Sequence, residues 1–334
     1  MDKNERLPHI DIAKGILIIL VVVGHVLTGS HFVTKVMIRV INSFHMPAFF
    51  IITGMLTNTS KLRAQPFGTF LKKKAVRLLV PYVVFELVGM VWQMIMLGNT
   101  HPDIVAAVRN ILTVHCYVGA DWFLIAMFFA EMILYWINKY AFEKWYVYTA
   151  AVSFLAAFYL PDEVWLLANC RRIFASLSFI LIGIQCRAFF QMDSARLFAL
   201  CTTGLIAGAA LNSGTPSIAL RLFERPLLFI MCGICGAYVV LFVSRIISKS
   251  GSLRGIVEQV GKASLVIMGT HQNVVLIFSV LYGVWTSLLT KTIILASIVF
   301  VEIPLVLLCR RFVPAWVGET KKRQVCGKIF DVKR

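Results

Sequence analysis

Apolar runs long enough to cross a bilayer recur from one end of the chain to the other. A helix needs about 20 such residues to span the hydrocarbon core. Of the 334 residues, 59% are apolar and 15% are charged, whereas a soluble domain is about half apolar and about a quarter charged. This excess of apolar residues excludes a water-soluble enzyme. It also excludes a nucleic-acid-binding domain, in spite of the formal net charge of +17.

The apolar runs predict an all-α fold, a polytopic membrane protein with a bundle of about ten transmembrane helices. A polar segment, 100–119, is expected to form a loop with a helix lying at the membrane interface. We expect one membrane domain, 1–310, followed by a basic cytoplasmic tail, 311–334. The expected spans are 12–29, 36–57, 77–97, 120–138, 145–160, 173–190, 196–212, 226–247, 262–282 and 288–309.

The distribution of basic residues predicts that both termini are cytoplasmic. When ten spans alternate from a cytoplasmic amino terminus, 25 of the 33 Lys and Arg residues fall on the cytoplasmic side and 8 on the other. This is the bias of the positive-inside rule. A miscounted helix would invert every later loop and flatten the bias, so the distribution favours ten spans.

Polar side chains inside the first two spans are candidate functional residues, because a charged group at mid-bilayer costs about 2.5–3.5 kcal/mol on insertion scales. His25 and His45 fall at nearly one depth on adjacent antiparallel helices. Asp11, Lys14 and His25 share one stripe of the first helix, with Lys14 roughly 16 Å from His25. The stripe suits a ligand that enters at the cytoplasmic mouth. Imidazoles satisfied by backbone carbonyls and a lysine reaching the headgroups are the alternatives.

A cationic cluster opens the third helix. Lys72, Lys73 and Lys74 precede Arg77, which lies just inside the span, and Pro81 removes the hydrogen bond to the Arg77 carbonyl. A bent helix with several cations at its cytoplasmic end can bind a polyanion. Arginine in particular binds phosphate through two parallel hydrogen bonds. A positive cluster that faces anionic lipid is the alternative.

Later apolar runs contain further polar residues. Trp122 stands at the start of the fourth span, where an aromatic-belt anchor is the alternative interpretation. His271, Gln272 and Asn273 interrupt the ninth span. Glu131 and Glu302 are intramembrane carboxylates for which the sequence shows no partner.

Several sequence motifs, taken in their order along the chain, resemble those of the integral-membrane acyltransferases called acyltransferase family 3, in its fucose-acetylase-like branch. The resemblance covers residues 8 to about 310. It rests on Ile10–Gly15 with Val23-Gly24-His25, on Phe44–Gly54, on Arg77–Tyr82, on Trp122–Leu124 and on Gly261–Leu265 followed by His271.

The resemblance implies that the chain moves an acyl group from cytoplasmic acyl-CoA to a hydroxyl of a carbohydrate, a glycolipid or another cell-envelope acceptor. It favours acetyl as the acyl group, acetyl-CoA as the donor and the bacterial plasma membrane as the location. It predicts neither a metal ion nor a nucleic-acid partner, and it leaves the oligomeric state open. Many members have arginine at the place of Lys14, and lysine lacks the fork that binds phosphate.

The resemblance also assigns candidate roles. His25 takes the place of the essential histidine, as general base or acyl relay, and Arg77 that of the essential arginine. The expected donor-binding residues are Lys14, Lys73, Lys74, Arg77 and Tyr82. The expected substrate or pocket residues are Asp11, His45, Trp122 and His271.

The expected site is a water-accessible crevice that joins the cationic mouth to His25. A transporter or flippase of a small polar solute or a lipid-linked sugar, without chemistry, is the alternative, because polar residues at mid-depth also serve a translocation path. The sequence shows no inverted repeat that would favour the transporter.

Overall fold

The computed structural model describes residues 8–27, 32–98, 104–112, 114, 116–140, 143–161, 165–212, 214–222, 224–283 and 287–314. This part of the chain is built from helices joined by turns, with an isolated bridge between Ser217 and Leu222. The helices are α1 (Pro8–Val26), α2 (Phe32–Leu56), α3 (Thr59–Ala64), α4 (Phe67–Lys74), η1 (Ala75–Leu79), α5 (Val80–Leu97), α6 (Ile104–Leu112), α7 (Trp122–Tyr140), η2 (Glu143–Trp145), α8 (Tyr146–Tyr159), α9 (Trp165–Gln185), α10 (Arg187–Gln191), α11 (Ala195–Leu211), α12 (Pro226–Ser248), α13 (Gly251–Lys262), α14 (Ser264–Tyr282) and α15 (Leu288–Phe312).

Each of the ten predicted spans coincides with a helix, but fewer of these helices meet the length and hydropathy of a membrane span. Within the described residues, seven do so: α1, α2, the continuous helix Phe67–Met96, α7, α12, α14 and α15. α8 has 14 residues and α11 has 17, and the amino-terminal turns of α9 hold Arg171 and Arg172. The count of ten and the cytoplasmic termini therefore stay predictions. Residues 315–334 of the predicted tail lie outside the described part.

The largest difference from the predicted boundaries lies at the third span. The third span begins at Phe67 rather than at residue 77, because α4, η1 and α5 form one continuous helix that carries the lysine cluster. The segment 100–119 contains α6, as expected, and then a turn that leads into α7.

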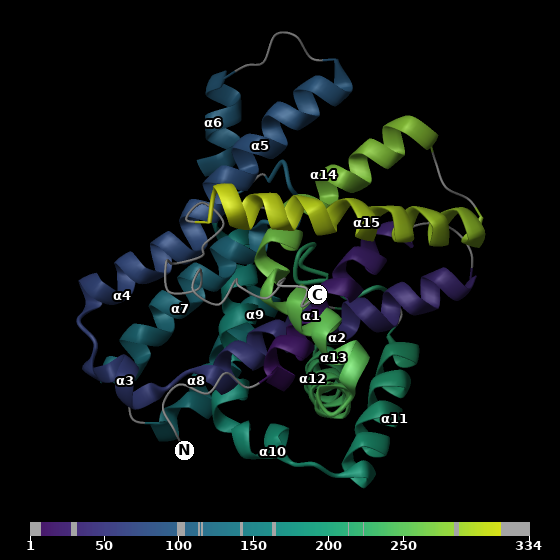
Figure 1. Ribbon diagram of the computed structural model, residues 1–334. Helices are drawn as coiled ribbons and strands as arrows, with labels where there is room; N and C mark the ends of the chain where they lie inside the picture. The colour runs from purple at the N-terminus through teal and green to yellow at the C-terminus, as the bar shows by residue number, and fades with distance from the viewer. Residues whose placement is uncertain are drawn as a thin grey trace, which may run out of the picture.

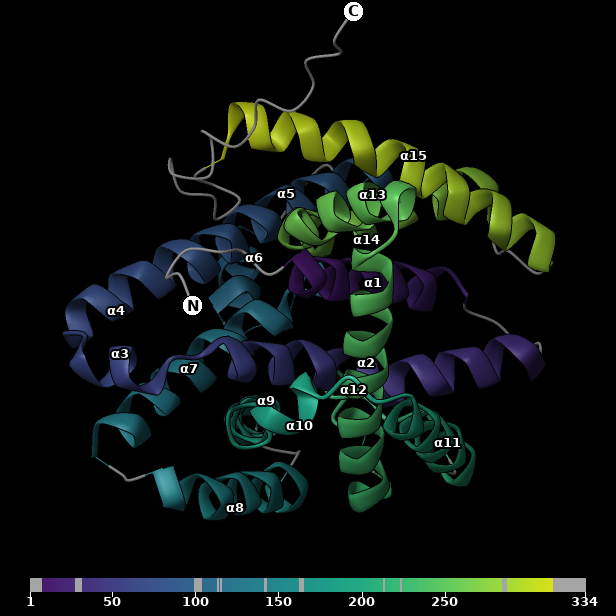
Figure 2. The same ribbon diagram turned by 60° about the horizontal axis from the view of Figure 1, so that its bottom comes forward.

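α1 lies at the centre of the bundle, packed against α2, α12, α13 and α14. In Figure 1, α3, α4 and α7 gather on the left and α11 lies at the lower right. Figure 2 shows α12 upright while α1 and α2 run across the view, so α12 crosses both helices at a steep angle. The central position of α1 brings its polar stripe next to α13 and α14.

Two glycines allow α1 and α13 to touch backbone to backbone. A Cβ added to Gly261 would lie 1.7 Å from the carbonyl oxygen of Asp11, and one added to Gly15 would lie 2.3 Å from the carbonyl oxygen of Val257. Small residues at such a crossing let helices approach closely in a membrane. The contact fixes α13, and with it Lys262, beside the acidic and basic residues of α1.

Candidate functional site

A cationic cavity of about 390 Å³ is lined by residues of α1, α2, α3, α4, η1, α7, α13 and α14. Two carboxylates, Asp11 and Glu131, also line it, so its formal net charge is +4. A cavity with this excess of positive charge attracts anions. Its six cations are Lys14, Lys61, Lys73, Lys74, Arg77 and Lys262.

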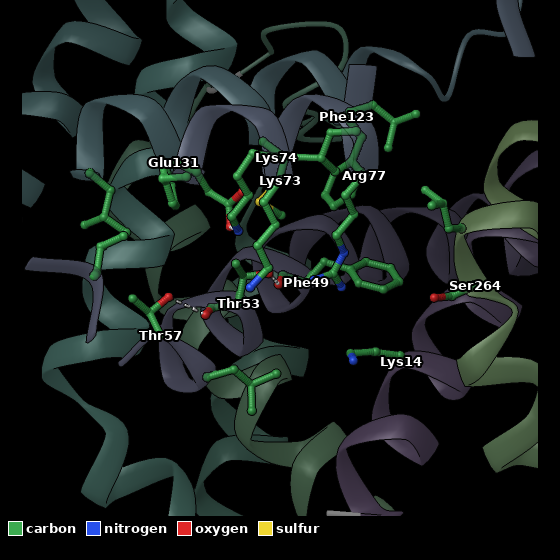
Figure 3. Close-up of a pocket in the computed structure, with 18 of the residues that line it drawn as sticks. Lys14, Phe49, Thr53, Thr57, Lys73, Lys74, Arg77, Phe123, Glu131 and Ser264 are labelled. Carbon is green, nitrogen blue, oxygen red and sulfur yellow. Dashed lines mark hydrogen bonds and ion pairs between the residues drawn. The ribbon is translucent and has the colours of Figure 1, made fainter. Parts of the chain in front are cut away.

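The local helix geometry explains where Arg77 points. Residues Ala75–Leu79 form a π-helical turn, and the Val80 N–H bonds to the carbonyl of Ala75. Pro81, which has no N–H, follows at once, so the normal hydrogen-bond ladder is interrupted at this place. The predicted bend is thus realised as a π-turn, a feature often found at functional sites. Lys73 and Arg77 both extend into the cavity, above Lys14 (Figure 3).

Several cavity cations have acidic partners. Lys74 forms an ion pair with Glu131, and Lys14 lies 3.4 Å from Asp11. Lys262 lies 2.5 Å from Glu258, which is one turn earlier on α13.

Lys61, Lys73 and Arg77 differ from these residues. All three are exposed, and among the described residues none of their side chains has an ion pair or a hydrogen bond. Lys61 lies apart on α3, whereas Lys73 and Arg77 lie one turn apart on one continuous helix, where their charges also act on Lys74. Lys73 and Arg77 are therefore the pair of cations best placed to take one phosphate group together.

His25 lines a different cavity, of about 270 Å³. Among the described residues that line this His25 cavity, no side chain carries a formal charge when His25 is neutral. Amides, a phenol and a hydroxyl are groups that hydrogen-bond an uncharged polar ligand. The lining residues are His25, Gln93, Tyr117, Gln272, Asn273, Val275, Leu276 and Ser279.

His25 contacts two neighbouring residues of α14. The side-chain amide nitrogen of Gln272 lies 3.2 Å from Nε2 of His25 and 3.5 Å from Nδ1. The His271 ring packs against the His25 ring, with centroids 5.1 Å apart. His271 is fully buried, and its Nδ1–H donates to the carbonyl of Ile267 at 2.7 Å. Its Nε2 has no hydrogen-bond partner among the described residues.

Four of the predicted site residues line neither cavity: the buried His271 described above, and Tyr82, His45 and Trp122. The Tyr82 hydroxyl is buried and donates to the carbonyl of Ile111 at 2.7 Å. His45 donates from Nδ1 to the carbonyl of Ile41 at 2.7 Å, which is the local backbone bond considered as the alternative. Trp122 is buried, with the Arg172 guanidinium 6.0 Å from its ring.

Among the described residues, the cationic cavity and the His25 cavity share no lining residue. They are therefore separate cavities in this conformation, and the expected continuous crevice is not seen in the described part of the chain. On α14, Met268 lines the cationic cavity and Gln272 the His25 cavity, with buried His271 between them. Both cavities adjoin α1, because Lys14 of the cationic cavity and His25 of the other lie 11 residues apart on this helix.

Similarity to known proteins identifies the family. A family model described as an acyltransferase domain matches residues 7–308, nearly the whole chain. The chain belongs to this acyltransferase family. The nodulation protein NolL of Sinorhizobium fredii (strain NBRC 101917 / NGR234) is 39% identical over 84 residues, a match that spans 23% of each chain. No solved structure matches.

Membership in the acyltransferase family confirms the resemblance found in the sequence. Together with the seven apolar helices of the described part, it identifies the chain as a multi-pass membrane protein of the acyltransferase family. Its pair of unpartnered cations, on α4 and η1, shares a cavity with Lys14 of α1, and its exposed imidazole stands near the carboxyl-terminal end of α1.

The sequence did not reveal several residues of the two cavities. Lys61 and Lys262 look like ordinary cytoplasmic lysines, and only the fold brings them to the cationic cavity. Gln93 lies inside an apolar run, and a lone amide in a membrane span is a sequence feature that could have marked it as a cavity residue. Gln272 belongs to the polar triplet of the ninth predicted span, but its contact with His25 joins residues that are 247 positions apart.

Proposed function

We propose that this membrane acyltransferase moves an acetyl group from acetyl-CoA, bound in the cationic cavity, to a hydroxyl of a carbohydrate or another cell-envelope acceptor, bound in the His25 cavity. The observation that carries the proposal is the pair of unpartnered cations, Lys73 and Arg77, in a cavity of net charge +4.

The charges of the cationic cavity support a phosphorylated donor. Coenzyme A carries a pyrophosphate and a ribose phosphate, and acyl-CoA presents its thioester at the far end of an uncharged arm. Arg77 offers a planar fork that binds phosphate oxygens in a bidentate way, and Lys73 adds a point charge. Phe49, Phe123 and Met268 give the cavity an apolar wall that suits the uncharged arm.

The composition of the His25 cavity supports an uncharged, hydroxyl-bearing acceptor. Gln93, Gln272 and Asn273 provide amide groups that can both donate to and accept from hydroxyls. Tyr117 provides an aromatic side chain of the kind that packs against a sugar ring. Among the described residues, neither lysine nor arginine lines this cavity, so the two cavities differ in charge.

The chemistry requires a base at the acceptor. Neutral His25 takes the proton of the acceptor hydroxyl, whose oxygen attacks the thioester carbon. A C–O bond forms, the C–S bond breaks, and the proton passes from the imidazole to the departing thiolate. In the relay variant, the imidazole accepts the acyl group first and then passes it on. Both routes need the thioester to reach His25, so the layer that contains Met268 and His271 must open when the donor binds.

The experiment compares donor binding with transfer in the purified full chain. We expect His25→Ala to bind acetyl-CoA with wild-type affinity and to lose acceptor-dependent release of coenzyme A. Lys72→Ala is the matched control, because Lys72 is exposed and does not line the cavity. Full transfer activity in His25→Ala would end the role of His25. An absence of coenzyme A release in the wild type with every sugar tested would favour a carrier without chemistry.

A further inference from the structure

We propose that Lys61 binds the ribose phosphate of the coenzyme A donor, and that this contact restricts the donor to free acyl-CoA rather than an acyl group carried on a protein. The inference rests on the proposed function and names the substrate class of the same cavity. It follows from where Lys61 lines the cationic cavity and from how its helix, α3, is held.

The course of α2 gives the cationic cavity a direction. A Cβ added to Gly24 would lie 3.9 Å from the Asn42 side chain, so the neighbouring His25 lies beside the first half of α2. Phe49 follows Asn42 about two turns later and lines the cavity. Thr57, after the last turn of α2, lines the same wall (Figure 3). The cavity therefore extends along α2 in the direction that leads away from His25.

Lys61 lies beyond this end of α2. α3 begins after a connection of two residues and presents one face to the cavity. Asn58, Lys61 and Gln65 all line the cavity, as residues three and four apart on one helix face can do. Lys61 is thus the cation at the end of this wall that points away from His25.

Side chains of α7 hold α3 in this position. Asn138 donates to the Thr59 carbonyl at 2.9 Å. The Tyr135 hydroxyl donates to the Gln65 carbonyl at 2.8 Å. These two bonds fix both ends of a six-residue helix, which is too short to be stable by itself. On the opposite face of α3, Arg63 donates to the Asn138 carbonyl at 2.9 Å, so α3 is a fixed platform between α7 and the cavity.

The backbone of Lys61 is fixed, but its charge is available. Its N–H donates to the Asn58 side chain at 2.9 Å, and its carbonyl accepts from the Gln65 N–H at 3.1 Å. Its side chain is exposed and makes neither an ion pair nor a hydrogen bond with the described residues. Three other lysines of the cavity have acidic partners. Lys61 can therefore take an anionic group without giving up an existing contact.

Two separate sets of free cations match a donor with two separate anionic groups. Lys73 and Arg77 lie one turn apart and suit the pyrophosphate, whereas Lys61 lies alone on another helix. In coenzyme A the pyrophosphate lies between the pantetheine arm and the ribose that bears the second phosphate. When the thioester is directed toward His25, the ribose phosphate points the other way, toward Lys61. A lysine ammonium is a compact point charge on a flexible stem and can pair with a single phosphate group.

This contact separates two classes of thioester donor. A carrier protein presents its acyl group on phosphopantetheine, which has a single phosphate in place of the pyrophosphate and no ribose phosphate. Such a donor leaves Lys61 without a partner. Free acyl-CoA engages both sets of cations, so the cavity selects it over a carrier-bound acyl group.

The test measures by equilibrium titration how the purified full chain binds acetyl-CoA and dephospho-acetyl-CoA, which lacks only the ribose phosphate. Lys61→Gln removes the charge, and Lys61→Arg keeps it. Lys72→Gln is the matched control, because Lys72 is exposed and does not line the cavity. Since the Lys61 side chain has no partner among the described residues, its replacement should leave α3 in place.

We expect the wild type to bind acetyl-CoA roughly 3- to 30-fold more tightly than the dephospho form, as a charge-assisted hydrogen bond at an exposed site implies. Lys61→Gln should bind both donors with about the affinity that the wild type has for the dephospho form. Lys61→Arg and Lys72→Gln should keep the preference. Acetyl phosphopantetheine, the part that a carrier protein would present, should bind about equally to the wild type and to Lys61→Gln.

Four results would overturn the contact. The first three are the absence of a preference in the wild type, a preference that survives in Lys61→Gln, and a loss of preference in Lys72→Gln equal to that in Lys61→Gln. The fourth is a clear loss of affinity for acetyl phosphopantetheine in Lys61→Gln, because Lys61 would then hold the phosphate of the pantetheine arm.

The two proposals fail in different ways. If the wild type binds both acetyl-CoA and its dephospho form with equal affinity, the role of Lys61 is wrong and the proposed function stands. If the wild type binds neither, the cationic cavity is not a coenzyme A site, and both proposals are wrong.

Discussion

Met268 and Gln272 lie one helical turn apart on α14, yet they line different cavities. Met268 lines the cationic cavity, Gln272 contacts His25, and His271, which precedes Gln272 in the chain, is buried against the His25 ring. If donor and acceptor bind on opposite sides of this turn, the reaction depends on how readily the layer opens.

The first prediction concerns this layer. Met268→Trp places a larger side chain at the end of the cationic cavity, where the thioester has to pass. We expect kcat for transfer to fall by roughly tenfold or more, because small misplacements of reacting groups are costly. The Kd for coenzyme A should stay within about twofold, since that molecule is held by its phosphates. Steady-state kinetics gives kcat and equilibrium binding gives the Kd. An equal loss of kcat and of affinity for coenzyme A would contradict the prediction.

A second prediction concerns the unpartnered arginine. Arg77→Glu should weaken acetyl-CoA binding by roughly 10- to 100-fold, because hydrogen bonds to charged groups are strong and the charge is reversed. Lys72→Glu, five residues earlier and outside the cavity, should change the affinity little. Isothermal titration with both variants separates a specific phosphate contact from the general positive field. Equal weakening in the two would show that only the field matters.

A third prediction concerns Glu258, which lies on α13 outside the apolar spans. The hydrogen bond from Lys262 lowers the pKa of the Glu258 carboxyl. Glu258→Gln should release Lys262 toward the cavity and tighten acetyl-CoA binding by about twofold, with a stronger dependence on salt. Binding measured at two ionic strengths checks this, and weaker binding would contradict it.

The same pair predicts a pH dependence. A carboxyl whose pKa is lowered in the folded state stabilises that state above its unfolded pKa, about 4.3, and the contribution is lost as the pH falls through the lower folded value. The wild type and Glu258→Gln should therefore differ in thermal stability at neutral pH and converge in acid. A difference that persists or grows below the folded pKa would show that another group is responsible.

A fourth prediction concerns the crossing of α1 and α13. Gly261→Ala puts a Cβ 1.7 Å from the Asp11 carbonyl oxygen, so the helices must move apart. We expect a loss of about 1–3 kcal/mol in stability, as for an overpacked core. Gly255→Ala is the matched control on the same helix, because nothing lies within 4 Å of its Cβ. Thermal unfolding of both proteins in detergent should separate them, and equal stability would contradict the close contact.

The sequence predicted the helices and much of the cationic cavity for clear physical reasons. Helical periodicity placed Asp11 and Lys14 on one stripe, and both line the cavity. The predicted cationic cluster at the start of the third helix includes Lys73 and Arg77, which are four residues apart and therefore lie on one helix face, and both line the cavity.

Contacts between distant segments could not be predicted in this way. Glu131 had no visible partner because Lys74 lies 57 residues away, and only packing of α7 against α4 joins them. Gln272 meets Ala120 across 152 residues. The separation of the two cavities depends on how α14 packs, which periodicity does not determine. Hydropathy, similarly, gave ten apolar runs without showing that α8 and α11 are short helices.

The central claim is that a donor held by Lys73 and Arg77 delivers its acyl group to the nitrogen of His25. A cryo-EM map of the full chain with a non-hydrolysable acetyl-CoA analogue tests it most directly. We predict phosphate density at Lys73 and Arg77, and the acetyl end beyond Met268, within reach of Nε2 of His25. Phosphates bound elsewhere, or an acetyl end that stays on the Lys14 side of an unopened Met268 and His271, would contradict the claim.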